Sequence, residues 1–316
     1  PNNNLYLYPM KMIPVFKDYI WGGTNLKNFN KSSKLTKIAE SWEVSCNEDG
    51  LSKIENGPYA GKYLKDVINL NFNKFIGNNI KKGSKFPLII KLIDANQDLS
   101  IQVHPSFKTV DKELGESEKS EMWYILDCEE NSYIFYGFNK DLKKEEFSKY
   151  LLDGNICSVL NKVYVKKGDI FFIPAGTIHA LGKGIVAAEI QQNSNTTFRI
   201  FDYNRKDANG NYRTLHIEEA KRALSFKKTY INRFKECSND IFQCRYFKVK
   251  KEKILDHIEF SSKEDSFCVI QFIRGNGNIE YRNLVHNANK GDTFFIPANM
   301  GNYIINGNCE ILTTRI

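Results

Sequence analysis

Leu99-Ser100-Ile101-Gln102-Val103-His104-Pro105 has the pattern of a half-buried strand. Successive side chains of a strand point to opposite faces, so Gln102 and His104 share one face while Ile101 and Val103 share the other. The apolar face predicts burial against a core. The other face places two potential metal ligands side by side, although His104 could also be a histidine that only precedes a proline turn.

Two further ligands are predicted on strands that follow in the chain. Glu121 begins the apolar run 121–126, and His179 ends the run 171–179, where capping a loop is the alternative role. Two imidazoles, one carboxylate and one amide oxygen form a nitrogen and oxygen set that zinc tolerates, with room for water or substrate. We therefore predict that Gln102, His104, Glu121 and His179 bind one Zn²⁺ per chain.

Three motifs of this chain closely resemble the type I mannose-6-phosphate isomerases, and the chain resembles their short bacterial form. The motifs are 99–105, Lys119-Ser120-Glu121-Met122 and Pro174-Ala175-Gly176-Thr177-Ile178-His179, and the likeness covers roughly the first two thirds of the chain. Those proteins are zinc-dependent cupins. The resemblance implies interconversion of mannose 6-phosphate and fructose 6-phosphate through an enediolate, with a sugar phosphate as the small-molecule partner.

Basic side chains in apolar strand patterns are candidate catalytic groups. Lys91 lies within 86–93 and Arg199 within 198–201, and a buried cation is costly unless an anion pairs with it. A guanidinium suits a phosphate or an enediolate oxygen pair. Lys119 shares a face with Glu121, which would hold its ammonium against the metal-bound carboxylate. Salt bridges, or a lysine that reaches the strand edge, are the structural alternatives.

The sequence also suggests a proton carrier and substrate contacts, and each of these residues has an alternative structural role. Glu189 is the candidate base, since the resemblance places the matching glutamate close to the pocket; orienting a ligand histidine is its alternative role. Ser100, Trp21 and Glu40 are predicted to contact the substrate, with a packed tryptophan beside a turn as the alternative for Trp21. Asn195 and Leu181 stand where many longer relatives have Asp and Tyr.

An internal repeat indicates a duplicated β unit. The segment 167–175 (KGDIFFIPA) recurs as 290–298 (KGDTFFIPA), and short strands with Gly and Asn turns favour a jelly roll. Extending this alignment places His179 on Asn302, so the second copy has lost the ligand. We predict a mainly β chain of two cupin (jelly-roll) domains: residues 1–229, catalytic and zinc-binding with helical insertions, and residues 230–316, degenerate and metal-free.

Helical spacing predicts the insertions. Apolar residues over 63–72 predict a helix that stops at Gly77, and those over 107–114 predict a short helix after His104. The segment 142–152 is predicted to form a helix with Asp141 as its cap. Thr214 is predicted to cap the next helix, whose apolar face includes Ile217 and Leu224.

Composition restricts the class of protein. The chain is 41% hydrophobic and 13% aromatic, ample for a core, and it has no apolar run of the ~18 residues that a membrane span needs. The start of the chain is polar without a signal core, and the seven cysteines include no C-x-x-C, which favours reduced thiols and a cytoplasmic protein.

The charge pattern bears on the partners. The net charge of +8 comes from lysines spread along the whole chain rather than from a dense block, so nucleic-acid binding is not expected. A mildly positive field suits an anionic sugar phosphate. We expect a monomer or a homodimer.

Two other functions compete with the isomerase. A metal-dependent cupin oxygenase would use a similar scaffold, but usually with a tighter His-x-His cluster, which is absent from this sequence. A non-catalytic sugar-binding or regulatory cupin would keep the fold and lose ligands. The first copy keeps all four predicted ligands, which favours catalysis.

Overall fold

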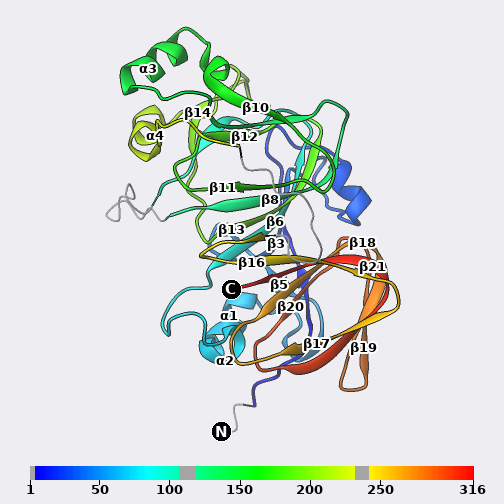
Figure 1. Cartoon of the computed structure of the whole chain (residues 1–316). Coiled ribbons are helices and arrows are strands. Elements are labelled where there is room, and N and C mark those ends of the chain that lie inside the picture. The colour runs from blue at the N-terminus through cyan, green and yellow to red at the C-terminus, as the bar shows by residue number, and fades with distance from the viewer. Residues whose placement is uncertain (1–3, 107–117, 232–241) are drawn as a thin grey trace.

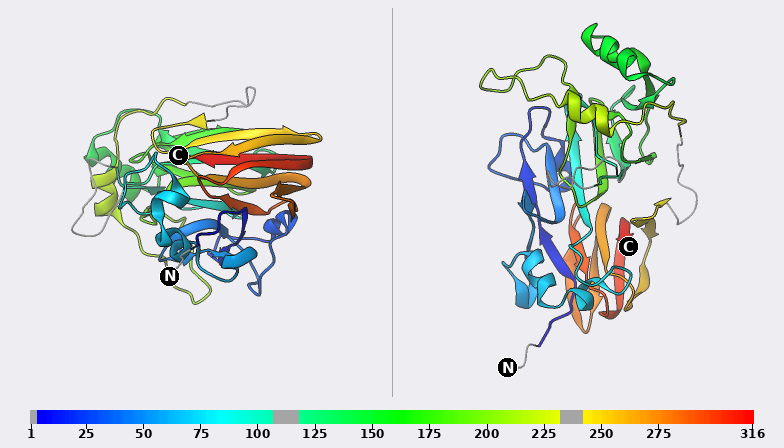
Figure 2. Two further views of the ribbon diagram at one scale, coloured as in Figure 1. Left: turned by 90° about the horizontal axis from the view of Figure 1, so that it is seen from below. Right: turned by 90° about the vertical axis from the view of Figure 1, so that its left-hand side faces the viewer.

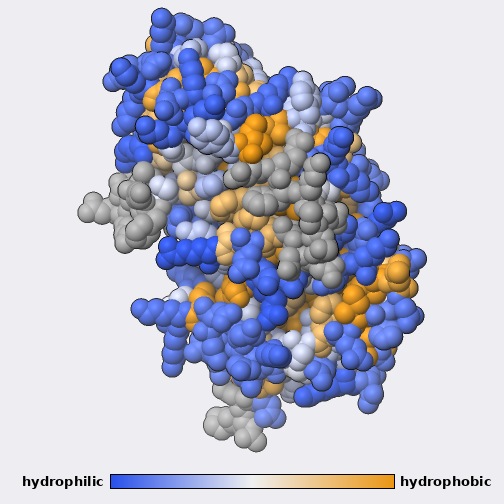
Figure 3. Space-filling model, in the orientation of Figure 1, coloured by the Kyte–Doolittle hydropathy of each residue, from blue (hydrophilic) through white to orange (hydrophobic). Residues whose placement is uncertain are grey.

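The fold is mainly β, as predicted, with β sheets stacked in layers (Figure 1). The structure, a computed structural model, describes residues 4–106, 118–231 and 242–316. The helix predicted over 107–114 lies outside these residues. Among them, no helix is long and apolar enough to cross a membrane. The face shown in Figure 3 is mostly hydrophilic, with apolar side chains in separate groups.

The N-terminal half contains a five-stranded sheet, ordered β10-β9-β12-β7-β14, and a seven-stranded sheet, ordered β11-β8-β13-β6-β3-β2 with β4 beside β3. Side chains from both sheets line one cavity, so the two sheets face each other as in a jelly roll. The strands are β2 (Val15–Lys17), β3 (Glu40–Asn47), β4 (Gly50–Leu51), β6 (Leu88–Ala95), β7 (Ile101–Val103), β8 (Glu121–Cys128), β9 (Tyr133–Phe138), β10 (Leu160–Tyr164), β11 (Ile170–Ile173), β12 (His179–Leu181), β13 (Ile185–Gln192) and β14 (Phe198–Phe201).

The alternation predicted for the strand β7 is confirmed. Ile101 and Val103 are fully buried in a cluster with Phe147 of α3 (Lys144–Leu152) and Ala220 of α4 (Ile217–Ala223). These helices lie at the end of the molecule away from the C-terminal strands (Figure 2). The opposite face of β7 therefore turns Gln102 toward the other sheet.

The remaining helices are short. The helix predicted over 63–72 is present as α1 (Leu64–Leu70), followed by α2 (Phe72–Ile76), and Gly77 ends α2 as expected. Single 3₁₀ turns occur at Asn25–Phe29, Gly57–Tyr59 and Ile156–Val159.

Two predicted helix caps are wrong. Asp141 does not cap α3, whose N-cap is Lys143; its carboxylate accepts a hydrogen bond from the backbone of Lys228 and so ties another segment to this one. Thr214 does not cap α4, whose N-cap is His216. Sequence spacing located both helices, but the long-range contact of Asp141 outweighed local capping, and α4 begins two residues later than Thr214 could cap.

The C-terminal half forms a nine-stranded sheet that also takes in two N-terminal strands. Its path is β15-β16-β21-β18-β20-β1-β5, with β17 beside β21 and β19 beside β18. The strands are β1 (Met10–Ile13), β5 (Lys53–Ile54), β15 (Phe242–Gln243), β16 (Lys248–Ile254), β17 (His257–Ser262), β18 (Cys268–Tyr281), β19 (Leu284–Ala288), β20 (Thr293–Ile296) and β21 (Gly301–Arg315). β1 lies in the first predicted domain and pairs with β20 of the second, so this sheet contains strands from both sides of the predicted boundary at residue 230. The boundary itself stays a prediction.

The sequence repeat is a repeat of structure. Gly168 and Gly291 both have positive φ, 88° and 96°, which glycine adopts at little cost. In each turn the following aspartate accepts a backbone hydrogen bond of 2.8 Å, Asp169 from Lys166 and Asp292 from Asn289. The strands that follow, β11 and β20, occupy corresponding places in the two halves.

A buried ion pair joins the two halves. The Nζ of Lys31 lies 2.7 Å from Glu43 Oε1 and donates to the carbonyl of Gly291 at 2.6 Å. Thr293 donates to the same carboxylate at 2.9 Å. Ser41 donates to the other carboxylate oxygen at 2.5 Å, and Glu43 is only 1% exposed, so these three side chains rather than water stabilise its charge.

Lys31→Met should destabilise the protein by about 3 kcal/mol, because it leaves the carboxylate of Glu43 buried without its cation. Urea denaturation measures the effect. Lys27→Met, an exposed lysine four residues earlier, is the control and should change the free energy of unfolding very little. Equal stability of the two variants would mean that the pair adds nothing to the interface.

Candidate active site

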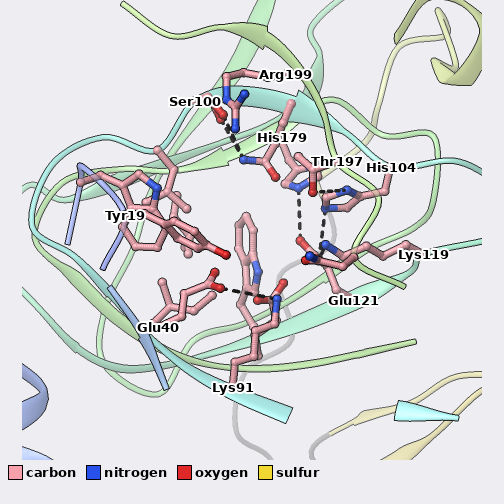
Figure 4. Close-up of a pocket in the computed structure, with 18 of the residues that line it drawn as sticks. Tyr19, Glu40, Lys91, Ser100, His104, Lys119, Glu121, His179, Thr197 and Arg199 are labelled. Atoms are coloured by element: carbon pink, nitrogen blue, oxygen red, sulfur yellow. Dashed lines mark hydrogen bonds and ion pairs between the residues drawn. The ribbon is translucent and has the colours of Figure 1, made fainter. Parts of the chain in front are cut away.

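Three ligand side chains meet at the edge of the cavity between the two N-terminal sheets (Figure 4). His104 follows β7, Glu121 begins β8 and His179 begins β12. The Nε2 of His104 lies 3.3 Å from Glu121 Oε2, and the Nε2 of His179 lies 3.1 Å from Glu121 Oε1. One ligand atom from each lies within 4.8 Å of the others, and all three residues are about 2% exposed.

The hydrogen bonds around these residues fit a bound metal ion. The Nδ1 atoms of His104 and His179 face the carbonyls of Thr196 at 3.1 Å and Thr177 at 2.8 Å. A carbonyl only accepts, so each Nδ1 carries the proton and each Nε2 keeps a free lone pair. Oε2 of Glu121 is buried and accepts no hydrogen bond. Three free donor atoms of this chemistry suit a divalent cation such as zinc.

Gln102 stands beside this cluster in the sheet. It is paired directly opposite His179 on β12 and opposite Arg199 on β14, so the three side chains form one row across the sheet. Its amide nitrogen donates to the carbonyl and the hydroxyl of Ser100, at 3.2 and 3.3 Å. The amide oxygen is thereby left available as a fourth ligand.

Glu189 lies against Glu121 rather than against a ligand histidine. Burial, and then the charge of Glu121, raise the pKa of Glu189 well above its usual range. Burial opposes ionisation of Glu121 as well, but the neighbouring His104, and then Glu189 and His179, outweigh burial and hold the pKa of Glu121 well below its usual range. Two carboxylates in contact oppose each other's ionisation, and here that effect raises the pKa of Glu189.

Two buried lysines lie near this carboxylate pair. Lys91 Nζ is 3.7 Å from Glu40 and 4.5 Å from the ring centre of Trp42; burial lowers its pKa, but Glu40 and the other carboxylates outweigh burial and the pKa is raised. Lys119 Nζ is 3.9 Å from Glu121, as predicted, and burial lowers its pKa. Both pairings match the anionic partners that the sequence required.

Arg199 lies across the cavity from Lys91 (Figure 4). Its Nη1 donates to the carbonyl of Thr214 at 2.7 Å, and its Nε is buried without a hydrogen-bond partner. Within the described ranges no ion pair joins Arg199 to a carboxylate, so the alternative of a structural Arg–Glu bridge finds no support there. Burial, and then the neighbouring Arg213, lower its pKa.

All of the predicted site residues line the same cavity of about 240 Å³, and sequence reasoning missed several others. Tyr19, Thr197 and Arg213 also line it. Tyr19 could have been found, since it lies two residues before the predicted Trp21, in the turn that leads to Gly22. Arg213 gave no such signal: it is positioned by the buried carboxylate of Asp202, which also binds Arg205.

A jelly roll defines the class as a cupin, and the buried His/Glu/His cluster in its cavity could hold a metal ion. Within that class, the catalytic-domain profile of phosphomannose isomerase type I matches residues 10–135, and the mannose-6-phosphate isomerase cupin-domain profile matches residues 238–316. The chain belongs to the type I phosphomannose isomerase family, which confirms the predicted family, fold class and enzyme class.

Similar proteins span the whole chain. The probable mannose-6-phosphate isomerase GmuF of Bacillus subtilis is 37% identical over 98% of this chain and 99% of its own, and ManA of the same organism is 34% identical over the same shares. The crystal structure of mannose 6-phosphate isomerase from Bacillus subtilis, 36% identical, superposes with a TM-score of 0.88 over 98% of this chain and 99% of that one. A putative mannosephosphate isomerase from Archaeoglobus fulgidus, 20% identical over 99% of both chains, shares the fold with a TM-score of 0.81.

Proposed function

We propose that this protein interconverts mannose 6-phosphate and fructose 6-phosphate. The observation that carries the proposal is the buried His104–Glu121–His179 cluster, whose Nε2 atoms and free carboxylate oxygen face a cavity lined with cations. In the aldose-to-ketose direction the proton on C2 leaves, an enediolate forms, and a proton returns at C1 while the hydroxyl proton passes from O2 to O1. The atoms balance without any co-reactant.

Gln102, His104, Glu121 and His179 would hold one zinc ion per chain. With three neutral ligands and one carboxylate, the bound ion keeps a net positive charge that polarises a carbonyl and stabilises oxygen anions on adjacent carbons. The second contacts of the histidines, the carbonyls of Thr196 and Thr177, orient both rings for this role.

Glu189 is the group we assign to the proton transfer. Burial and the neighbouring Glu121 raise the pKa of Glu189, so its carboxylate is a stronger proton acceptor than a free one, which suits a group that takes a proton from C2 and returns it to C1. Lys119 and Lys91 place ammonium groups beside it for the developing oxygen charge. Both lysines are buried, so water screens them little.

The remaining wall of the cavity would hold the sugar phosphate. Arg199 offers a planar guanidinium for the phosphate or the enediolate oxygens. Ser100 and Glu40 present polar side chains, and Trp21, about 4% exposed, gives an apolar wall beside Tyr19, with ring centres 5.7 Å apart. On this ground we assign the substrate contacts to Ser100, Trp21 and Glu40.

A coupled isomerase assay combined with metal analysis tests the proposal. We expect turnover of both hexose 6-phosphates, about one zinc per chain, loss of activity after chelation and its return when zinc is added back. Sugar phosphate binding without turnover would favour the non-catalytic cupin, and iron with oxygen consumption would favour the oxygenase. Either result would overturn the isomerase assignment.

A further inference from the structure

The C-terminal sheet repeats the layout of the catalytic cavity, strand by strand. In the N-terminal half one row of paired residues runs Phe171, Trp123, Glu189 and Lys91 across β11, β8, β13 and β6. The repeated segment matches Phe294 to Phe171. The row of paired residues that starts at Phe294 runs through Ile270, Thr313 and Lys250 across β20, β18, β21 and β16. Lys250 thus stands where Lys91 stands, and Thr313 where Glu189 stands.

The neighbouring positions identify what replaced the metal ligands. Cys268 is paired with Ile296 as Glu121 is paired with Ile173, so a thiol occupies the place of the ligand carboxylate. On β21, Asn302 is exposed, whereas Tyr303 is buried and its hydroxyl is hydrogen-bonded to Cys268. The sequence alignment placed Asn302 at the position of His179, but Asn302 does not face the interior as His179 does. The pleat of β21 turns the next residue, Tyr303, inward instead.

These inward side chains enclose a second cavity, of about 400 Å³. Lys248 and Lys250 share one face of β16, with Arg315 across the sheet from Lys248. Two carboxylates, Glu252 and Asp265, also line the cavity, and Asp265 is paired with Arg315 at 3.2 Å. The lining therefore includes three basic and two acidic side chains.

The cavity also offers a ring-binding surface and hydroxyl groups. The rings of Phe260 and Tyr303 are stacked, with centres 5.4 Å apart and 15° between their planes. Several hydroxyls, including those of Ser261 and Thr313, line the same space. Over the described residues the only His/Cys/Asp/Glu cluster with metal-binding geometry is the catalytic one, so metal chemistry finds no support here.

We propose that this C-terminal cavity binds a small phosphorylated sugar without converting it. Its volume falls within the range of small-molecule sites. Lys250 and Lys248 suit a phosphate through charge-assisted hydrogen bonds, hydroxyls suit the sugar, and an aromatic face packs against the C–H face of a ring. The second copy has lost the metal ligands and the proton carrier but kept the lysine of the row, so binding remains and catalysis does not.

Calorimetric titration with 1,5-anhydroglucitol 6-phosphate tests the inference, because this ring cannot open and therefore cannot isomerise. The full chain with its metal should bind two equivalents. Lys250→Met should weaken the second binding event by about tenfold or more, the loss expected for one charge-assisted hydrogen bond, with kcat and KM of isomerisation unchanged. Lys253→Met, exposed on the same strand and facing away, is the matched control and should bind as the wild type does.

Three outcomes would overturn the proposal of a second sugar-phosphate site. The wild type could bind only one equivalent, or Lys250→Met could leave the second binding event unchanged. Inorganic phosphate could also bind the second site as tightly as the sugar phosphate does. The isomerase assay keeps this inference apart from the proposed function, since a chain that isomerises but binds one equivalent fails only here.

Discussion

His179→Asn should fold, lose its bound zinc and lose isomerase activity. The amide is a poorer zinc ligand than an imidazole, and the shorter side chain does not bring a donor atom to the ~2.0–2.2 Å that a zinc bond needs. The variant should still melt cooperatively, because the strand β12 keeps its pairing with β7 and β9 through backbone groups. Zinc per chain, thermal melting and the coupled assay measure the three properties.

Two variants serve as controls for this substitution. His257→Asn changes an exposed histidine of the C-terminal sheet and should keep full zinc and full activity. Asn302→His should create no second zinc site, since residue 302 faces outward on β21. Full zinc together with full activity in His179→Asn would contradict the metal assignment.

Strand alternation made the centre of the site predictable from sequence. A period of two on β7 separates Gln102 and His104 from the buried Ile101 and Val103, and the structure has that arrangement. Lys91 was equally informative, because a buried ammonium requires an anion and Glu40 supplies it, whereas Arg199 is only partly buried and has no carboxylate partner among the described residues. A site residue can therefore be predicted from sequence when the alternation pattern of its own strand already determines that it is buried.

Features that depend on distant segments could not be predicted in the same way. Asp141 has capping chemistry, yet its carboxylate accepts a hydrogen bond from the backbone of Lys228, which is far away in the sequence. The pairing of β1 with β20 joins residues almost the whole chain apart, and neither strand carries a local signal for the other. Asn302 shows a further source of error. After a turn that is repeated within the chain, a shift of one residue in the following strand changes which side chain faces inward.

Arg199→Lys should reduce kcat/KM by about 100-fold or more with zinc still bound, the size of effect seen when one donor to a developing oxyanion is removed. The substitution keeps the charge but loses the planar fork that can bind two oxygens at once. It also loses the hydrogen bond from Nη1 to the carbonyl of Thr214, which sets the direction of the guanidinium. Zinc content should be unchanged, because Arg199 is a neighbour of Gln102 in the sheet and not itself a predicted ligand.

The separate values of kcat and KM distinguish the two roles that Arg199 could have. A guanidinium that grips only the phosphate stabilises ground state and transition state alike, so its loss raises KM and leaves kcat nearly unchanged. A guanidinium that stabilises the enediolate acts mainly in the transition state, so its loss lowers kcat. Arg274→Lys, at an exposed position on β18, is the control for an arginine change outside the cavity. Near-normal kinetics in Arg199→Lys would mean that this arginine only supports the loop at Thr214, and the cationic wall opposite Lys91 would then have no part in the reaction.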